Sequence, residues 1–234
     1  METQGVKINI PFLNKLSTEL SLLAIKTEKL IFELAGENFN IGSPKQLGII
    51  LFEKLKLIDK PKKTKTGQYS TAEEILSSLE KNHVIVSKIL HWRSIKKLLS
   101  TYVDTLPMEV NSVTGRIHTE YNQATTSTGR LSSNSPNLQN IPIRTKLGEK
   151  VRKAFVSRNK EFLIMAADYS QIELRIIASL SNDPVMIKSF KNNQDIHAST
   201  AANVYDVPIE DVTRIQRNNA KTVNFGIIYG VSAF

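Results

Sequence analysis

Residues 162–180 of this 234-residue chain, FLIMAADYSQIELRIIASL, contain the change of pattern that decides the fold. The apolar run 162–168 ends on Asp168, which is typical of a short strand that stops at the edge of a sheet. From residue 171 onward the apolar side chains recur at helical spacing instead. A strand followed at once by a helix predicts an α+β region, in which we expect Asp168 and the nearby Glu173 to line a cleft.

The first hundred residues are predicted to be helical. Apolar side chains recur at helical spacing over residues 12–34, and Gly36 is placed to end that helix. Ser43–Pro44 offers a cap and a proline at the first helical position, and residues 70–73 have the spacing of a capping box. A further long helix is predicted over residues 84–106.

The pattern becomes mixed after Pro107. Turn residues at 111–115, followed by alternation over 116–123, predict a β-hairpin. Residues 125–150 are rich in Ser, Thr, Asn and Gly and lack a core pattern. A loop of that length is usually functional or disordered.

The C-terminal part is predicted to be helical again. Asp183 and Asp195 are placed to cap two helices, and residues 213–229 are expected to form the last one. The fold class is therefore α+β and helix-rich.

Composition restricts the class of protein. Lys and Arg outnumber Asp and Glu by 31 to 22, and the excess is spread along the chain, which favours a polyanionic partner such as nucleic acid. The longest apolar run, residues 162–167, is far below the ~18 residues of a membrane span. No secretory signal is visible in the first residues, and the chain has no cysteine. A cytoplasmic protein is expected.

Residues 54–68, KLKLIDKPKKTKTGQ, contain six lysines and one aspartate. With Pro, Gly and Thr and almost no apolar periodicity, this stretch should be an exposed loop. It is either a solvated basic loop or a loop that follows a phosphate backbone, since lysines neutralise phosphates without reading bases.

The last predicted helix places four side chains on one stripe. Arg217, Lys221, Phe225 and Tyr229 are spaced by four residues, so they drift only ~120° around the helix over three turns. Two cations suit a triphosphate, and aromatic rings suit a base that stacks on them. The alternative is an amphipathic helix with an aromatic core face and basic ends.

Asp168 is a candidate metal ligand. A carboxylate at the end of a strand can bind a hard cation such as Mg²⁺, which prefers oxygen ligands and keeps several waters. A helix cap or a solvated charge is the other interpretation of Asp168 and of Glu173.

Three segments resemble motifs of family A DNA polymerases, the bacterial DNA polymerase I type. The pattern R-x3-K-x3-F-G-x2-Y-G over residues 217–230 resembles the fingers helix of that family. DYSQIELR (168–175) is similar to its first palm motif, and TSTGRLSSNSPNLQNIPIR (126–144) to its template–primer segment. Residues 43–55, the lysine loop and residues 91–107 are similar to the thumb. The resemblance covers practically the whole chain.

The resemblance implies roles for individual residues. Asp168 would ligate the catalytic metals, two Mg²⁺ ions in the complete enzyme, with the Tyr169 carbonyl beside them. Arg217 and Lys221 would bind the triphosphate and offset charge that develops on the leaving pyrophosphate, so that Asp168, Arg217 and Lys221 are the implied catalytic residues. The implied nucleotide contacts are these two cations with Gln171, Glu173, His197, Phe225 and Tyr229.

Further roles follow from the same resemblance. Glu173 would occupy the space that a ribose 2′-hydroxyl needs, Phe225 would pack on the sugar and base, and Tyr229 would help to seat the templating base. Arg130 would reach the minor groove at the primer end, where acceptors are common to all base pairs. The other implied DNA contacts are Arg93, Lys97, Gln139, Asn140 and Arg144.

The resemblance also implies a domain organisation. The expected parts are a helical thumb-like region at 1–107 with the basic loop 54–68, a partial palm at 108–182 with the template–primer loop 125–144 and the metal-binding motif 168–175, and partial fingers at 183–234. The second palm motif of the family, His-Asp-Glu, is not found, because none of the four histidines is followed by an acid. The chain is therefore expected to be a fragment, inactive alone, whose strand at 162–168 keeps an apolar edge.

The expected function is template-directed DNA synthesis from dNTPs on primer–template DNA, by a monomer without a membrane partner. A non-catalytic DNA-binding remnant and a single-subunit RNA polymerase relative are the alternatives. Glu173 and Phe225 favour deoxynucleotides over ribonucleotides.

Overall fold

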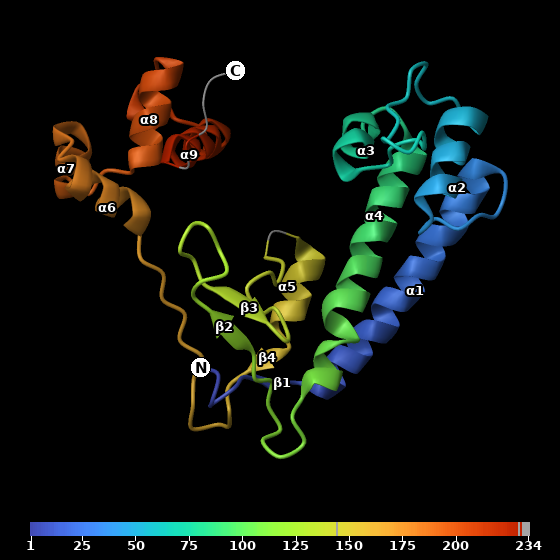
Figure 1. Ribbon diagram of the computed structural model, residues 1–234, viewed down its shortest axis with the longest axis horizontal. Coiled ribbons are helices and arrows are strands. Elements are labelled where there is room, and N and C mark those ends of the chain that lie inside the picture. Colours follow the sequence, from blue (N-terminus) through green and yellow to red (C-terminus); the bar gives the residue numbers. More distant parts are fainter. Residues whose placement is uncertain (144, 229, 231–234) are drawn as a thin grey trace. The chain divides into compact units, whose positions relative to one another are not determined.

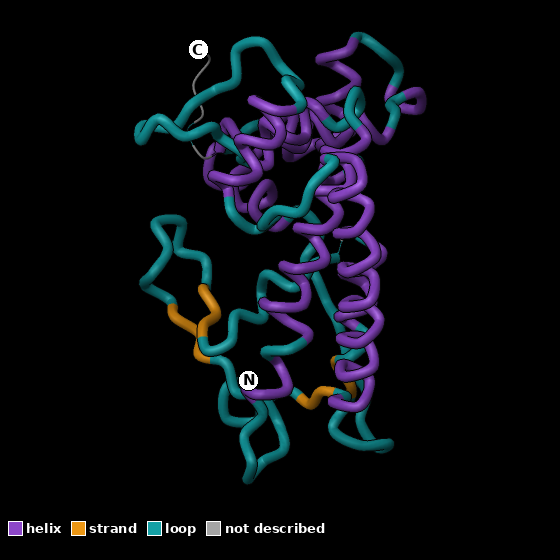
Figure 2. Tube along the Cα trace, turned by 90° about the vertical axis from the view of Figure 1, so that its right-hand side faces the viewer, coloured by secondary structure: helices purple, strands orange, loops and turns teal. Residues whose placement is uncertain are grey.

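The computed structural model describes residues 1–143, 145–228 and 230. It contains two compact units, Met1–Ile164 and Met165–Phe234. Helices dominate both, and the strands are short (Figure 2). The prediction of a helix-rich α+β fold with antiparallel strands is confirmed.

Two long helices form the frame of the first unit. Helix α1 (Ile10–Ala35) begins where the Asn9 side chain accepts a hydrogen bond from the amide of Phe12, and it ends at Gly36, whose φ of 74° is the left-handed cap predicted for it. Helix α4 (Val84–Leu98) lies alongside α1 in the opposite direction (Figure 1). The buried side chains of α1 recur every three or four residues, as predicted: Leu13, Leu16, Leu20, Ala24, Thr27, Ile31 and Ala35.

Burial of this apolar stripe drives the pairing of the two helices. Toward the N-terminal end of α1 the stripe packs on Ile95, Leu98 and Tyr102. The helical run predicted over residues 84–106 is continuous only to Val103 and changes pitch: α4 passes into a π-helical turn, Leu99–Val103, and after a turn at residues 104–105 a 3₁₀ turn, Leu106–Glu109, follows.

A second apolar cluster closes the other end of the α1–α4 pair. It is built by α2 (Pro44–Ile49), the π-helical turn Ile50–Lys54 that continues it, and α3 (Glu73–Leu79). Ser43 caps α2 as predicted, since its hydroxyl accepts from the amide of Gln46.

The capping box predicted at residues 70–73 is wrong. The residue that precedes α3 is Ala72, and no side chain caps this helix. The neighbouring Thr71 hydroxyl accepts a hydrogen bond from Arg93 Nη2 at 3.1 Å, which joins the segment before α3 to α4.

The lysine loop is exposed, as predicted, and its base is ordered. Lys63 and Tyr69 form an antiparallel bridge, and the amides of Thr64 and Ser70 donate to the carbonyls of Gln68 and Lys62 at 2.7 and 2.8 Å. The Tyr69 ring packs on Phe52 with ring centroids 5.5 Å apart. All six lysines of residues 54–68 are exposed at the surface.

The strands of the first unit form two small antiparallel pairs. Strand β1 (Lys7–Ile8) pairs with β4 (Phe155–Val156), and β2 (Glu120–Asn122) pairs with β3 (Ser132–Asn134). Helix α5 (Lys146–Arg152) precedes β4.

The predicted hairpin has a different partner from the one expected. The turn at 111–115 forms, with the Gly115 amide donating to the carbonyl of Asn111 at 2.8 Å. The Arg116 carbonyl accepts from the Asn111 amide across this turn at 3.0 Å, but the residues after Arg116 do not pair back. They pair forward with β3, and Ile117 bridges to Val6.

A buried polar cluster explains this forward pairing. The Thr119 and Ser133 hydroxyls lie 2.6 Å apart, and Thr119 Oγ1 lies within 2.8 Å of the Pro136 carbonyl oxygen. The amide of Leu138 donates to Ser133 Oγ at 3.1 Å. These contacts join the 116–123 segment to residues 133–138, inside the stretch predicted to be a long loop.

The second unit is a succession of helices. Helix α6 is Ile172–Ser181, α7 is Pro184–Lys191, α8 is Ile196–Tyr205 and α9 is Arg214–Ile228, with a 3₁₀ turn at Ile209–Asp211 before α9. Asp183 and Asp195 cap α7 and α8 as predicted. None of the helices in the described part combines the length and the apolar character that crossing a membrane requires.

The strand predicted over residues 162–168 is wrong. Residues 162–169 form no regular element, and their apolar side chains are exposed, with Leu163 94% and Met165 87% accessible. An apolar run becomes a strand only when a neighbouring strand accepts its backbone hydrogen bonds. Within the described residues, this segment has no such neighbour.

Candidate functional site

The packing of α8 against α9 brings together several of the implied nucleotide contacts in the described part of the second unit. Each helix has a defined start. Asp195 Oδ1 accepts from the amides of His197 and Ala198 at 2.9 and 3.1 Å. Before α9, Thr213 and Gln216 form a reciprocal capping box, which sequence analysis missed although the Thr-x-x-Gln spacing signals it.

Asp195 also holds Arg217 of α9. Its second oxygen, Oδ2, accepts from Arg217 Nε at 2.8 Å and lies 2.6 Å from Nη2. Burial alone would raise the pKa of the Asp195 carboxyl. The hydrogen bond from Arg217, the amides of Ala198 and His197, and the positive charge outweigh burial and lower that pKa. One carboxylate therefore begins α8 and orients the first cation of α9.

His197 lies buried between the two helices, with 3% of its surface exposed. Its Nδ1 is 3.1 Å from Asn224 Nδ2, and the same amide nitrogen is 3.1 Å from Thr200 Oγ1. Burial is the largest cause that lowers the pKa of His197, and the charges of Arg217 and Lys221 add to it, against the opposing effect of Asp195. Burial and the two cations therefore favour the neutral form of the imidazole over the imidazolium.

The remaining members of the predicted stripe surround this histidine. The rings of Phe225 and His197 are 5.8 Å apart and tilted by 43°. Lys221 is exposed, with Nζ 5.9 Å from the Phe225 ring centroid. The structure therefore brings His197, Arg217, Lys221 and Phe225 together. Tyr229 lies outside the described residues.

The first palm-like motif lies ahead of and within the start of α6. Asp168 and Tyr169 are on the exposed segment before that helix, and Glu173 lies in its first turn. Gln171 adopts a left-handed backbone with φ 53° and ψ 39°, and its Oε1 is buried without a hydrogen-bond partner in the described part of the chain. Among the described residues no group of three or more His, Asp or Glu side chains is placed to hold a metal ion.

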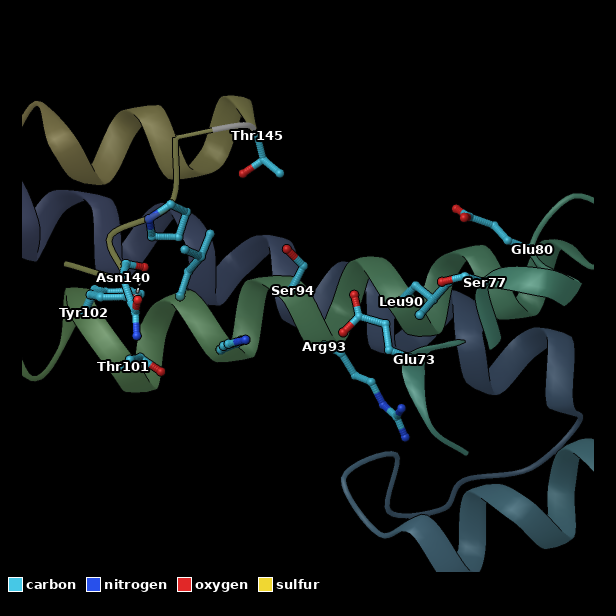
Figure 3. A pocket seen from close by; sticks show the side chains of 13 residues that line it. Glu73, Ser77, Glu80, Leu90, Arg93, Ser94, Thr101, Tyr102, Asn140 and Thr145 are labelled. Atoms are coloured by element: carbon cyan, nitrogen blue, oxygen red, sulfur yellow. Dashed lines mark hydrogen bonds between the residues drawn. The ribbon is translucent and has the colours of Figure 1, made fainter. Parts of the chain in front are cut away.

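The first unit has a cavity of about 760 Å³ along α4 (Figure 3). Two of the implied DNA contacts, Lys97 and Asn140, line it. The Tyr102 hydroxyl donates to the Asn140 carbonyl, which fixes the chain at this point.

Arg93 also lines this cavity, but its guanidinium is engaged elsewhere. In Figure 3 it points away from the other labelled side chains, and its Nη1 donates to the Thr71 carbonyl at 2.6 Å. Burial lowers its pKa, against the opposing effect of Glu73. In this structure Arg93 therefore serves first to hold the segment that precedes α3.

Of the other implied DNA contacts, Arg130 lies on the loop between β2 and β3, and Gln139 lies after β3. Arg130 and Gln139 are both exposed. The Thr119–Ser133 cluster described above holds the backbone between them. Arg144 lies outside the described residues.

Sequence analysis missed two partners of the implied nucleotide contacts. Asp195 was recognised as a cap but not as the counter-ion of Arg217, which is 22 residues away in the sequence. Asn224 was not singled out at all. Its position next to Phe225 was the available signal, but only the packing of α9 on α8 places it against His197.

Comparison with known proteins gives a consistent result. Residues 10–234 match the model of the family described as DNA polymerase family A. DNA polymerase I of Geobacillus stearothermophilus is 51% identical over the whole chain, and the thermostable DNA polymerase I of Thermus aquaticus is 47% identical.

A solved structure has the same fold. It is the POL domain of Pol1 from M. smegmatis in complex with DNA primer-template and dNTP, which is 42% identical. The TM-score is 0.86 over 98% of this chain and 40% of that one. The chain spans about a quarter of the length of its curated relatives, 26% and 28% for the two polymerases above. By family match, sequence identity and fold, this chain belongs to DNA polymerase family A.

Proposed function

We propose that this chain contributes the nucleotide-binding and part of the DNA-binding surface to template-directed DNA synthesis, the transfer of deoxynucleotides from dNTPs to a primer 3′-hydroxyl. The observation that carries the proposal is the cluster of His197, Arg217, Lys221 and Phe225 on α8 and α9. It combines two cations, an imidazole and an aromatic face, which are groups that suit a nucleoside triphosphate.

The cations of α9 serve the triphosphate in different ways. Arg217 is held by Asp195 through Nε and Nη2, so its orientation is fixed before a ligand arrives. Lys221 is exposed and free to follow the phosphates as charge moves to the leaving pyrophosphate. Fixed positive charge at the position where negative charge develops lowers the barrier to transfer.

Asp168 and Tyr169 are the proposed metal ligands. A carboxylate and a backbone carbonyl are oxygen donors, and both residues are exposed, which fits Mg²⁺ that keeps most of its waters. Two Mg²⁺ ions would activate the primer hydroxyl and stabilise the leaving oxygens. The carboxylate of Asp168 and the carbonyl of Tyr169 would supply one side of their coordination.

The remaining residues of the motif would select and seat the nucleotide. Glu173 in the first turn of α6 would exclude the ribose 2′-hydroxyl, and Phe225 would pack on the sugar and base. Gln171 would add a polar contact to the nucleotide through Oε1, which is buried without a hydrogen-bond partner in the described part of the chain. Tyr229 would seat the templating base.

The DNA would lie against the first unit. Lys97 and Asn140 in the cavity along α4, the exposed Arg130 and Gln139, and the lysine loop offer contacts to the backbone and minor groove. Arg93 and Arg144 complete the proposed set. The division into thumb (1–107), palm (108–182) and fingers (183–234), a monomeric state and a cytoplasmic location belong to the same proposal.

Binding of dATP and Mg²⁺ to this chain tests the proposal. Arg217→Ala and Lys221→Ala should each weaken binding in a calorimetric titration by about tenfold or more, because each removes a charge-assisted contact. Lys188→Ala on α7 is the control, since it removes an exposed lysine outside the cluster. Equal effects of all three substitutions would show that the affinity is nonspecific attraction.

Primer extension separates the proposal from a purely DNA-binding role. Two-metal transfer needs carboxylates on more than one element, so we expect this chain alone to bind primer–template DNA without extending it. A complete polymerase that carries this sequence should extend, and Asp168→Ala should abolish extension. If the substitution leaves extension intact, Asp168 is not a catalytic metal ligand, and that part of the proposal is wrong.

A further inference from the structure

The Nδ1 atom of His197 makes a polar contact with Asn224 of α9. Asn224 Nδ2 lies 3.1 Å from His197 Nδ1 and 3.1 Å from Thr200 Oγ1, so one amide group bridges two side chains that project from the same face of α8. His197 is buried, and no role has been assigned to Asn224.

The chemistry of this contact determines where the proton of His197 lies. An amide nitrogen carries two N–H donors and accepts no hydrogen bond. Its partner on the imidazole must therefore be a ring nitrogen with a free lone pair. In a neutral imidazole with Nδ1 as acceptor, the single proton is on Nε2.

The surroundings of His197 support a neutral ring. The charged groups that face it are Arg217 and Lys221 from α9 and Asp195 at the start of α8. Burial and the two cations disfavour the imidazolium, against the opposing effect of Asp195.

We propose that Asn224 is a positioning residue that holds His197 as the Nε2–H tautomer, so that the imidazole offers an N–H donor to a triphosphate oxygen. This inference rests on the proposed function of the cluster. A phosphate oxygen only accepts hydrogen bonds, so the Nδ1–H tautomer would present a lone pair at Nε2 and repel the ligand. Asn224 itself need not touch the nucleotide.

The tautomer is measurable directly in this chain. Long-range ¹H–¹⁵N correlation spectra of histidine-labelled protein at about pH 8, where histidines are neutral, distinguish the two ring nitrogens. The chain has four histidines, and His197→Gln assigns the signal of interest. We expect Nδ1 of His197 to show the shift of an unprotonated acceptor.

Asn224→Asp reverses the polarity of the contact with little change in shape. A carboxylate accepts hydrogen bonds, so the proton should move to Nδ1, and the added negative charge should raise the pKa of His197. Asn224→Leu removes the donor and should give a mixture of tautomers. Asn219→Leu is the matched control: Asn219 also joins α9 to α8, through the Tyr205 hydroxyl at 2.9 Å, but does not touch the histidine.

Binding of dATP and Mg²⁺ gives a second readout. Asn224→Asp should weaken it by about tenfold, the effect of losing a hydrogen bond to a charged group, while Asn219→Leu leaves it unchanged. A wild-type His197 protonated on Nδ1, or an Asn224→Asp spectrum identical to wild type, overturns the inference even if dATP binds. A wild-type chain that does not bind dATP overturns the proposed function and the triphosphate role, while the spectra still decide the tautomer.

Discussion

Replacing Asp195 with alanine should remove two interactions at once. Oδ1 caps α8 through the amides of His197 and Ala198, and Oδ2 pairs with Arg217. Loss of an aspartate cap costs about 1 kcal/mol. The ion pair is more than a third exposed on both sides, so solvent screening limits its contribution to about 0.5–1 kcal/mol. We expect Asp195→Ala to destabilise the α8–α9 pair by about 1.5–2 kcal/mol.

Related variants separate the two effects. Asp183→Ala removes only a cap, that of α7, and should cost about 1 kcal/mol. Asp195→Asn keeps a capping oxygen and loses the charge. The double-mutant cycle with Arg217→Ala should give a coupling energy of about 0.5–1 kcal/mol.

Amide hydrogen exchange on the α8 and α9 segments measures these free energies locally, without requiring the whole chain to unfold together. If Asp195→Ala opens α8 no more readily than Asp183→Ala opens α7, or if the cycle shows no coupling, Asp195 does not link the two helices energetically.

The Asp195 carboxylate makes the stability of the α8–α9 pair sensitive to acid. The pKa of Asp195 is lower in the folded chain than the ordinary 3.8, so its stabilising effect is complete above that value. It is lost as the pH falls through the lower folded pKa. Asp195→Asn should abolish this part of the acid dependence of exchange and leave the remainder.

Replacing Lys62 and Lys65 of the lysine loop with serine should reduce the slope of log affinity for DNA against log salt concentration by about two units. Anisotropy titrations between ~50 and 200 mM salt measure this slope. An unchanged slope would contradict a contact between the loop and the DNA phosphates. In a complete polymerase carrying this sequence, Glu173→Ala should admit ribonucleotides. Unaltered ribose discrimination in steady-state incorporation would contradict the proposal that Glu173 excludes the 2′-hydroxyl. Gly48→Ala would place a Cβ 2.9 Å from Tyr69 Cβ. This clash should lower the free energy of unfolding by about 1–2 kcal/mol, although alanine has the better helix propensity. A urea unfolding midpoint at or above that of the wild type would refute the clash.

Local signals in the sequence predicted much of the helical structure. The stripe of α1, its end at Gly36, and the caps at Ser43, Asp183 and Asp195 depend on neighbours within four residues, and all are confirmed. The strand at 162–168 and the pairing of 116–123 depend on partners elsewhere in the chain, and both predictions are wrong. Sequence pattern alone does not specify which backbone accepts a strand's hydrogen bonds.

In the candidate site, too, the sequence predicted what depends on local spacing and not what depends on tertiary contacts. The spacing of Arg217, Lys221 and Phe225 placed them on one helical face from sequence alone. Their partners Asp195 and Asn224 could not be predicted, because the contacts that join them cross from α8 to α9. The position of a residue on its own helix is local information, whereas the atom it meets is decided by tertiary packing.

The hydrogen bonds at the base of the lysine loop would lower the entropic cost of binding DNA. Ordering a free backbone residue costs about 1–2 kcal/mol, and a disordered lysine tail would lose that freedom at the moment of association. Here the Lys63–Tyr69 bridge and the bonds from Thr64 and Ser70 fix the backbone when the protein folds. In the proposed DNA complex the backbone near Lys62, Lys63 and Lys65 would need little further ordering, so the charge of these lysines would be available to the phosphates with a smaller entropic penalty.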